Sequence, residues 1–259
     1  MLSNPKPYRI LVINDDGIQA PGLALLESIS RELSDDVWVV APSDERSGAG
    51  HSVSLTTPIR MHQLDEKRYQ VNGTLTDCVL MALWQIMPDK RPNVLLSGIN
   101  TGANLVKDVT YSGTCAAAME GTLAGIRSIA LSEIRSDSGA VDFASAALHG
   151  PVLVRKVLAL DDWRAGSFFN INFPLCSADA VTGTRITTQR QRPPGAFAID
   201  TRHDARNHPY FWVKIRYPDG DHLAHIDLAA VAANEISVTL LKMDLTDHCW
   251  TDGLADLCS

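Results

Sequence analysis

The sequence lacks the features of a disulfide-bonded or membrane-spanning protein. It has only five cysteines, which are scattered and form no Cys-x-x-Cys pair: Cys78, Cys115, Cys176, Cys249 and Cys258. An odd number at such spacings predicts free thiols in a reducing compartment rather than a disulfide framework or a zinc site. The first residues, MLSNPKPYR, carry no long apolar stretch, and the next apolar run, Ile10 to Ile13, has only the length of a strand. We therefore expect no signal peptide, no membrane span and a cytoplasmic location.

Positive charge is also scarce. The 23 lysines and arginines are outnumbered by 30 aspartates and glutamates, which gives a formal net charge of -7. Binding to a nucleic-acid polymer needs a basic surface that replaces condensed counterions, so such a partner is not expected. A small anionic substrate would still need local neutralisation. In an acidic protein, a bound metal ion is the natural source of that positive charge.

The remaining composition is that of an ordinary globular protein, with 45% hydrophobic and 20% charged residues in a chain of 259. From Arg9 to about Ser132, apolar strand-length runs alternate with segments at helical spacing, which predicts a mostly parallel sheet covered by helices on both faces, a Rossmann-like α/β core. The expected central strands are Ile10–Ile13, Val37–Ala41, Val94–Leu96 and Ser128–Leu131. The expected helices are Pro21–Leu33, Leu75–Met87, Thr114–Ile126 and Val141–Leu160.

The pattern changes after Leu160. One more strand is expected in SFFNINFP, followed by a polar, arginine-rich and peripheral stretch from Thr182 to Arg206. The alternating run Tyr210–Tyr217 and the stretch Glu235–Leu241 predict strands of an antiparallel extension or a swapped arm. We therefore divide the chain into a catalytic core, residues 1–175, and a C-terminal extension, residues 176–259, that packs on the core and serves oligomerisation.

Three polar loops should meet at one edge of the predicted sheet. In an open parallel sheet, ligands bind outside the carboxyl ends of the strands. The loops there are Asn14–Gly17, Pro42–Ser52 and Ser97–Asn104. Adjacent carboxylates after a buried strand are costly unless a cation compensates them. Asp15 and Asp16, together with the Ser47 hydroxyl and the Asn100 amide oxygen, would form an all-oxygen site for one divalent ion per subunit, with Mg²⁺ or Mn²⁺ favoured.

Each of these four residues also has an ordinary structural explanation. One aspartate can cap the following helix or shape the turn with Gly17. Ser47 and Asn100 can bond to their own loop backbone. Only the convergence of all four at one sheet edge favours the metal site over these alternatives.

A second ligand site is predicted where the next helix begins. Ser112, Gly113 and Thr114 open a helix, and the backbone N–H groups of such a start bind anions, although an ordinary Ser/Thr N-cap is an equal alternative. Together with Asn104, these residues would hold a phosphate facing the metal. Arg46 and His51 could add positive charge or a proton donor, or they could be solvated loop residues.

The motifs INDDGIQAPG, VVAPSDERSGAGHS, GTLTDCVLMAL, LLSGINTGANLVKDVTYSGTCAAAMEGTLAG and NINFP occur here in order. In this order and spacing they resemble the SurE survival-protein family over most of residues 9 to 174, and HIDLAAVAANEISVTLL is similar to a segment near that family's end. The resemblance implies a metal-dependent 5′-nucleotidase with a Rossmann-like core, and the activity that some members have on 3′-nucleotides or short polyphosphate. It also implies Asp15, Asp16, Ser47 and Asn100 as metal ligands, and homodimers or homotetramers with exchanged C-terminal segments.

The resulting hypothesis is a phosphomonoesterase that hydrolyses nucleoside 5′-monophosphates by direct attack of metal-bound water, with Asp15 and Asp16 anchoring the metal. A haloacid-dehalogenase-type phosphatase would need Asp-x-Asp, which the segment from Asp15 to Gln19 does not supply. A zinc deacetylase of the kind that uses His-Pro-Asp-Asp-Glu does not match either, because Asn14 precedes Asp15 and no histidine pair is nearby. A non-catalytic nucleotide-binding or regulatory protein on the same core is the alternative from another class, since fold alone fits both.

Overall fold

The computed structural model describes residues 8–45, 48–136, 138–191, 197–215 and 224–248. Its strands are β1 (Arg9–Ile13), β2 (Asp36–Pro42), β3 (Arg60–Asp65), β4 (Arg68–Asn72), β5 (Val94–Thr101), β6 (Arg127–Glu133), β7 (Ser167–Phe173), β8 (Gly183–Thr187), β9 (Phe197–His203), β10 (Pro209–Ile215) and β11 (Glu235–Lys242). Its α-helices are α1 (Pro21–Arg31), α2 (Leu75–Met81), α3 (Gly113–Leu123), α4 (Ala144–Leu158) and α5 (Asp227–Ala232). Shorter helical turns are η1 (Ala82–Ile86), η2 (Val106–Thr110) and η3 (Ala178–Ala180).

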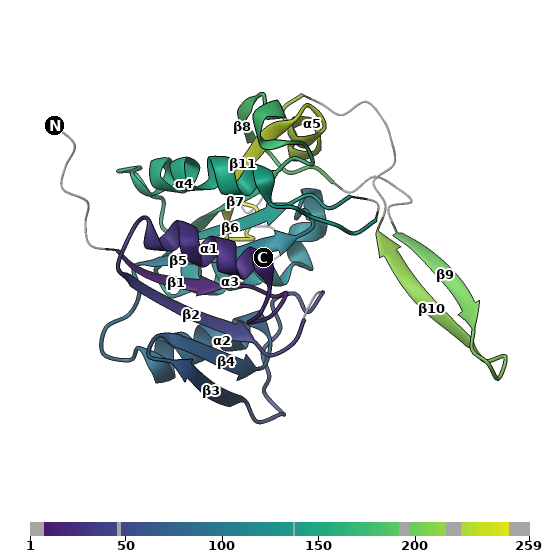
Figure 1. The fold of residues 1–259 in the computed structure, drawn as a ribbon, viewed down its shortest axis with the longest axis horizontal. Helices are drawn as coiled ribbons and strands as arrows, with labels where there is room; N and C mark the ends of the chain where they lie inside the picture. The colour runs from purple at the N-terminus through teal and green to yellow at the C-terminus, as the bar shows by residue number, and fades with distance from the viewer. Residues whose placement is uncertain (1–7, 46–47, 137, 192–196, 216–223, 249–259) are drawn as a thin grey trace, which may run out of the picture.

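A nine-stranded sheet in the order β3-β4-β2-β1-β5-β6-β7-β11-β8 forms the centre of the molecule (Figure 1). The strands from β4 through β2, β1, β5 and β6 to β7 all pair in parallel. β3 pairs antiparallel with β4, and β11 pairs antiparallel with β7. The parallel strands therefore all end at one edge of the sheet, and the loops that follow them lie there.

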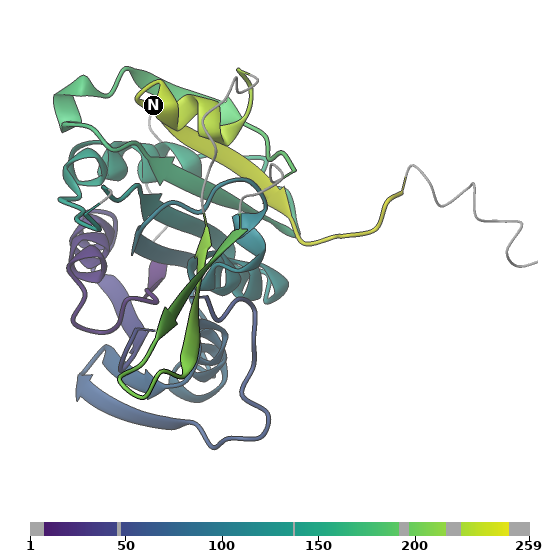
Figure 2. The same ribbon diagram turned by 90° about the vertical axis from the view of Figure 1, so that its right-hand side faces the viewer.

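The helices cover both faces of the sheet because each central strand is apolar on both sides. Ile10 and Val12 of β1 pack in one core with α1 and α4, whereas Leu11 and Ile13 pack in a second core with α2 and α3. Figure 2 shows helices on both sides of the sheet. α1 also needs a glycine at its second residue. A Cβ on Gly22 would lie 2.0 Å from the carbonyl oxygen of Ile99, so only glycine lets this helix pack against the end of β5.

The predicted α/β core is confirmed, with all four expected central strands and the strand in SFFNINFP present. The segment expected as one helix over Leu75–Met87 is α2 continued by the π-helical turn η1. The hairpin β3–β4 was not predicted, because Arg60–Asp65 is almost wholly exposed and shows no apolar alternation. β8 was also missed: it forms an edge strand within the stretch that the sequence indicated as peripheral.

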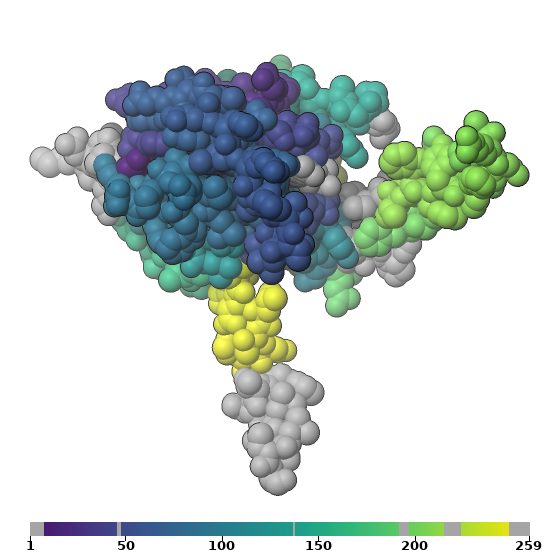
Figure 3. All heavy atoms as spheres, turned by 90° about the horizontal axis from the view of Figure 1, so that it is seen from below, coloured from purple at the N-terminus to yellow at the C-terminus, as the bar shows by residue number. Residues whose placement is uncertain are grey.

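The C-terminal third supplies the expected antiparallel extension. β9 and β10 form a separate two-stranded hairpin that projects from the body (Figure 3). The expected strand Tyr210–Tyr217 corresponds to β10 as far as Ile215, and its last two residues lie outside the described part. Glu235–Leu241 corresponds to β11, which extends the main sheet. The division of the chain at residue 175 stays a prediction.

Cys78, Cys115 and Cys176 are free thiols, as expected. Burial raises the pKa of the Cys115 thiol to about 12, so this group is an inert part of the core. Across the described ranges, no helix is both long and apolar enough to cross a membrane.

Candidate functional site

The ends of β1 and β5 meet the start of α3 at the carboxyl edge of the sheet. Asp15, two residues after the end of β1, is only 4% exposed. Its Oδ1 accepts a hydrogen bond of 2.8 Å from the Thr114 hydroxyl in the first turn of α3. The backbone of Gly113 lies so close that a Cβ there would stand 2.8 Å from Asp15 Oδ2. The first turn of α3 therefore rests directly on the Asp15 carboxyl group.

Asp16 is fixed from the side of β5. Its Oδ2 accepts a hydrogen bond of 3.1 Å from the backbone N–H of Thr101, and Asn14 Nδ2 lies 3.5 Å from the same oxygen. Asn100 directly precedes Thr101, and its Nδ2 donates to the carbonyl oxygen of Gly102 at 2.7 Å. This bond commits the amide nitrogen of Asn100 to the loop, which leaves its oxygen as the atom suited to a cation.

The electrostatics of this edge fit a cation. Burial, followed by the negative charge of Asp16, raises the pKa of Asp15 to about 6, against the lowering effect of the Thr114 hydrogen bond. Asn14 Oδ1 is fully buried and has no hydrogen-bond partner among the described residues. Carboxylate and amide oxygens, such as those of Asp15, Asp16 and Asn100, are the donors that a hard divalent ion prefers. The residues present therefore fit the expected metal.

At the start of α3 the structure shows the N-cap that the sequence offered as one alternative, and the anion site stays a prediction. The Ser112 hydroxyl accepts a hydrogen bond of 3.0 Å from the backbone N–H of Cys115, so Ser112 is the N-cap of α3. The backbone N–H groups of Gly113 and Thr114 fall in the first turn, where no helical carbonyl pairs with them. An anion at this end would thus meet backbone N–H groups and the positive end of the helix dipole.

The loop after β2 approaches the same helix from outside. The backbone N–H of Gly50 donates to the carbonyl oxygen of Tyr111 at 3.2 Å, next to the N-cap. His51, however, pairs through Nε2 with Glu120 at 2.9 Å. Glu120 lies eight residues after Ser112, which is about 12 Å along a helix. His51 is thus directed away from the start of α3. Arg46 and Ser47 lie outside the described residues.

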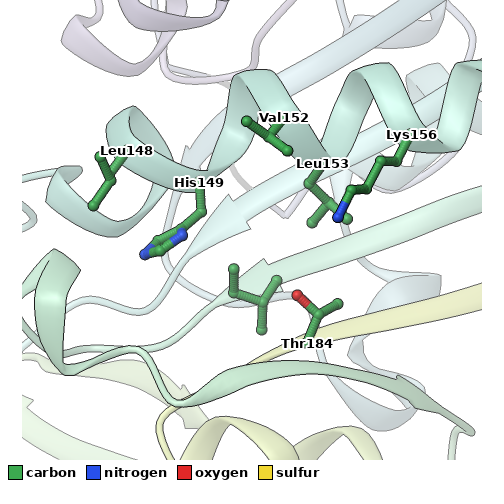
Figure 4. Close-up of a pocket in the computed structure, with 7 residues that line it drawn as sticks. Leu148, His149, Val152, Leu153, Lys156 and Thr184 are labelled. Atoms are coloured by element: carbon green, nitrogen blue, oxygen red, sulfur yellow. The ribbon is translucent and has the colours of Figure 1, made fainter.

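A shallow pocket of about 190 Å³ lies elsewhere, between α4 and the strands β8 and β11 (Figure 4). Leu148, His149, Val152, Leu153 and Lys156 of α4 line it opposite Thr184 and Ile236. The helix α4 covers the face of the sheet opposite to α3. The pocket is therefore separate from the cluster at Asp15.

Sequence reasoning missed several polar groups at this edge. No role in the site is predicted from the sequence for Asn14 or for the buried pair Asn170 and Asn172. Both asparagines are fully buried in β7 and bond to the main chain of Asn104. The signal was present, because Asn-x-Asn in an otherwise apolar strand places two amides on the same buried face.

The chain matches the family model described as Survival protein SurE over residues 10–195. It is 50% identical to the 5′-nucleotidase SurE of Methylorubrum extorquens over 245 residues, covering 93% of this chain and 95% of the relative. The 5′-nucleotidase SurE of Brucella anthropi is 48% identical over 93% of both chains. The crystal structure of the SurE protein from Aquifex aeolicus superposes with a TM-score of 0.83 at 34% identity, covering 96% of this chain and 99% of that one.

Proposed function

Since the chain belongs to the SurE family, we infer that it is a 5′-nucleotidase, a phosphomonoesterase that releases phosphate from nucleoside 5′-monophosphates. Relatives about 50% identical over nearly the whole chain carry the name of that enzyme. A non-catalytic nucleotide-binding role is not favoured for the same reason. We further propose that a single divalent ion, Mg²⁺ or Mn²⁺, binds at Asp15, Asp16, Asn100 and Ser47.

The observation that supports the metal is the contact between the Asp15 carboxyl group and the first turn of α3. A phosphate bound at the N–H groups of Gly113 and Thr114 would lie beside the carboxyl group of Asp15, whose neighbour in the chain is Asp16. Like charges at such distances repel strongly, and burial of Asp15 strengthens the repulsion. A cation between the phosphate and the carboxylates would cancel this repulsion. The carboxylates and the anion site would then bind their ligands together.

The residues of the chain then have separate tasks. Asp15 and Asp16 hold the ion, and their own positions are fixed by Thr114 and by the Thr101 N–H. Gly113, Thr114 and Asn104 orient the phosphate, and Ser112 contributes by capping the helix. When bound, the metal would neutralise charge on the phosphoryl oxygens and increase the acidity of a nearby water molecule. No phosphoenzyme intermediate is proposed.

The test is phosphate release from a panel of nucleoside 5′- and 3′-monophosphates, short polyphosphate and an aryl phosphate, each with Mn²⁺, Mg²⁺ or EDTA. We expect release from 5′-monophosphates that stops with EDTA and returns when excess Mn²⁺ is added. Equal release in EDTA would overturn the metal assignment. Saturable nucleotide binding without phosphate release under any metal would instead support the binding-protein alternative.

We also propose that the hairpin β9–β10 joins copies of the chain into a homodimer or homotetramer. Large apolar side chains are exposed on both of its faces: Phe197, Ile199, Tyr210, Phe211, Trp212 and Val213. An isolated two-stranded hairpin is only marginally stable in water, so it needs a surface to pack against. The free thiols of the described part also support a cytoplasmic location, and the acidic net charge supports small nucleotides over nucleic-acid polymers.

The double variant Trp212→Glu/Val213→Glu is expected to reduce the particle mass, because charges on both faces of β10 cannot be buried against another chain. The measurement is light scattering coupled to size-exclusion chromatography. The control is Leu55→Glu, which changes an apolar residue that is 88% exposed on the body. Wild type and control should show two or four copies and the double variant fewer. A double variant with the wild-type mass would exclude the hairpin as the contact.

A further inference from the structure

Two asparagines lie fully buried in the second half of β7, where apolar residues would be expected. Asn170 and Asn172 have no exposed surface and lie on the same face of the strand. Asparagine is disfavoured in strands, and burial of an amide group is costly unless its donors and acceptors are paired. A buried asparagine pair therefore indicates a specific task for its amide groups.

The task is visible in their hydrogen bonds, which converge on the main chain of one residue. Asn172 Oδ1 accepts the backbone N–H of Asn104 at 2.8 Å, and Asn172 Nδ2 donates to the carbonyl oxygen of Asn104 at 3.2 Å. Asn170 Nδ2 donates to the same carbonyl oxygen at 2.8 Å. The side chain of Asn104 is held as well, by a hydrogen bond of 2.8 Å from its Nδ2 to Ser132 Oγ.

Asn170 also contacts the first turn of α3. Its Oδ1 accepts a hydrogen bond of 3.7 Å from the Cys115 thiol, in the first turn of α3. The backbone N–H of Cys115 is in turn the group that Ser112 caps. The pair therefore connects the loop that carries Asn104 with the start of the helix that carries Gly113 and Thr114.

We propose that Asn170 and Asn172 are positioning residues for phosphate binding, which act by fixing the main chain of Asn104 against the first turn of α3. This inference rests on the proposed function, in which Asn104 and the start of α3 hold the phosphate. Neither asparagine touches the substrate. They set the separation of the two groups that do, which a rigid strand achieves better than a loop alone.

The test uses the Mn²⁺-loaded enzyme and the variant Asn172→Ala, with inorganic phosphate as a competitive inhibitor. We expect the inhibition constant of phosphate and KM to rise about tenfold, the scale of one or two lost hydrogen bonds. The effect should disappear in the background of Asn104→Ala. That variant keeps the main chain that the pair binds but removes the side chain that the pair positions. Equal effects in both backgrounds would overturn the proposal.

The matched control is Ser237→Ala, a fully buried polar residue that lies opposite Asn172 on β11 and bonds to Thr187 rather than to the loop. It should lower thermal stability without changing phosphate inhibition. If both variants weaken phosphate inhibition alike, Asn172 has a structural role only. If Asn172→Ala does not fold, Asn170→Ala gives the same comparison with one hydrogen bond to Asn104 removed. Absence of phosphate release in wild type would instead refute the proposed function.

Discussion

Replacement of Asp16 by asparagine is expected to reduce kcat/KM for nucleoside 5′-monophosphates by more than about a hundredfold, since even outer-shell partners of a metal contribute ~10–100-fold. Asparagine keeps the size of the side chain and can still accept the Thr101 N–H, so the fold of the loop should survive. The substitution removes one negative charge from the pair that holds the cation. Mn²⁺ affinity, measured by titration calorimetry, should fall together with activity.

The control for Asp16→Asn is Asp179→Asn, which removes the same charge from an exposed position in η3. It should leave turnover and Mn²⁺ affinity at the wild-type level. Thermal unfolding of both variants reports whether the fold is retained. Unchanged turnover and unchanged metal affinity in Asp16→Asn would show that this carboxylate is not a metal ligand, whatever the family resemblance implies.

The central part of the fold could be predicted because its physics is local. Strands such as Ile10–Ile13 are short apolar runs bounded by polar loops, and alternation with helical segments restricts the topology to a parallel sheet. The same logic located Asp15, Asp16 and Asn100 at one edge of the sheet, although Asn100 lies in the last residues of β5 rather than in a loop after it, because the strand runs on to Thr101. The structure brings these residues together with the first turn of α3.

The parts that were missed depend on contacts that no local pattern encodes. β3 has no buried side chain, so it is a strand only because β4 pairs with it. β8 joins the sheet by pairing in parallel with β11, about 50 residues later in the chain. The sequence offered His51 as a proton donor or as a loop residue, and it could not indicate the pairing of His51 with Glu120 on α3. Pairing partners that are distant in sequence decide all three.

The close approach of α3 to Asp15 explains why the first residue of this helix is a glycine. The approach of α3 to Asp15 requires a residue without Cβ at position 113, and the helix must begin there for its N–H groups to face the carboxyl edge. A glycine in a helix is normally unfavourable by roughly 1 kcal/mol relative to alanine. Its presence in the first turn of α3 thus indicates that the close approach to Asp15 matters more than helix stability.

The variant Gly113→Ala tests this close approach and is expected to lower kcat/KM by about a hundredfold, the scale reported for displacements near 1 Å in an active site. The new Cβ would stand 2.8 Å from Asp15 Oδ2 and 3.3 Å from Asp15 Cβ, so the carboxyl group must move. Alanine favours the helix itself, and thermal stability should therefore change little. Phosphate release and Mn²⁺ titration measure the two consequences.

Two glycines of the same chain separate a local effect on Asp15 from a general effect of an added methyl group. Gly183→Ala meets no heavy atom within 4 Å and should behave as wild type. Gly121→Ala, further along α3, would place its Cβ 2.6 Å from Ser128 Oγ and 2.7 Å from Leu95 Cδ1. It should lower stability through overpacking while affecting activity less than Gly113→Ala does. The opposite ranking would mean that α3 acts through its packing on the sheet, and the contact between Gly113 and Asp15 would then have no special role in catalysis.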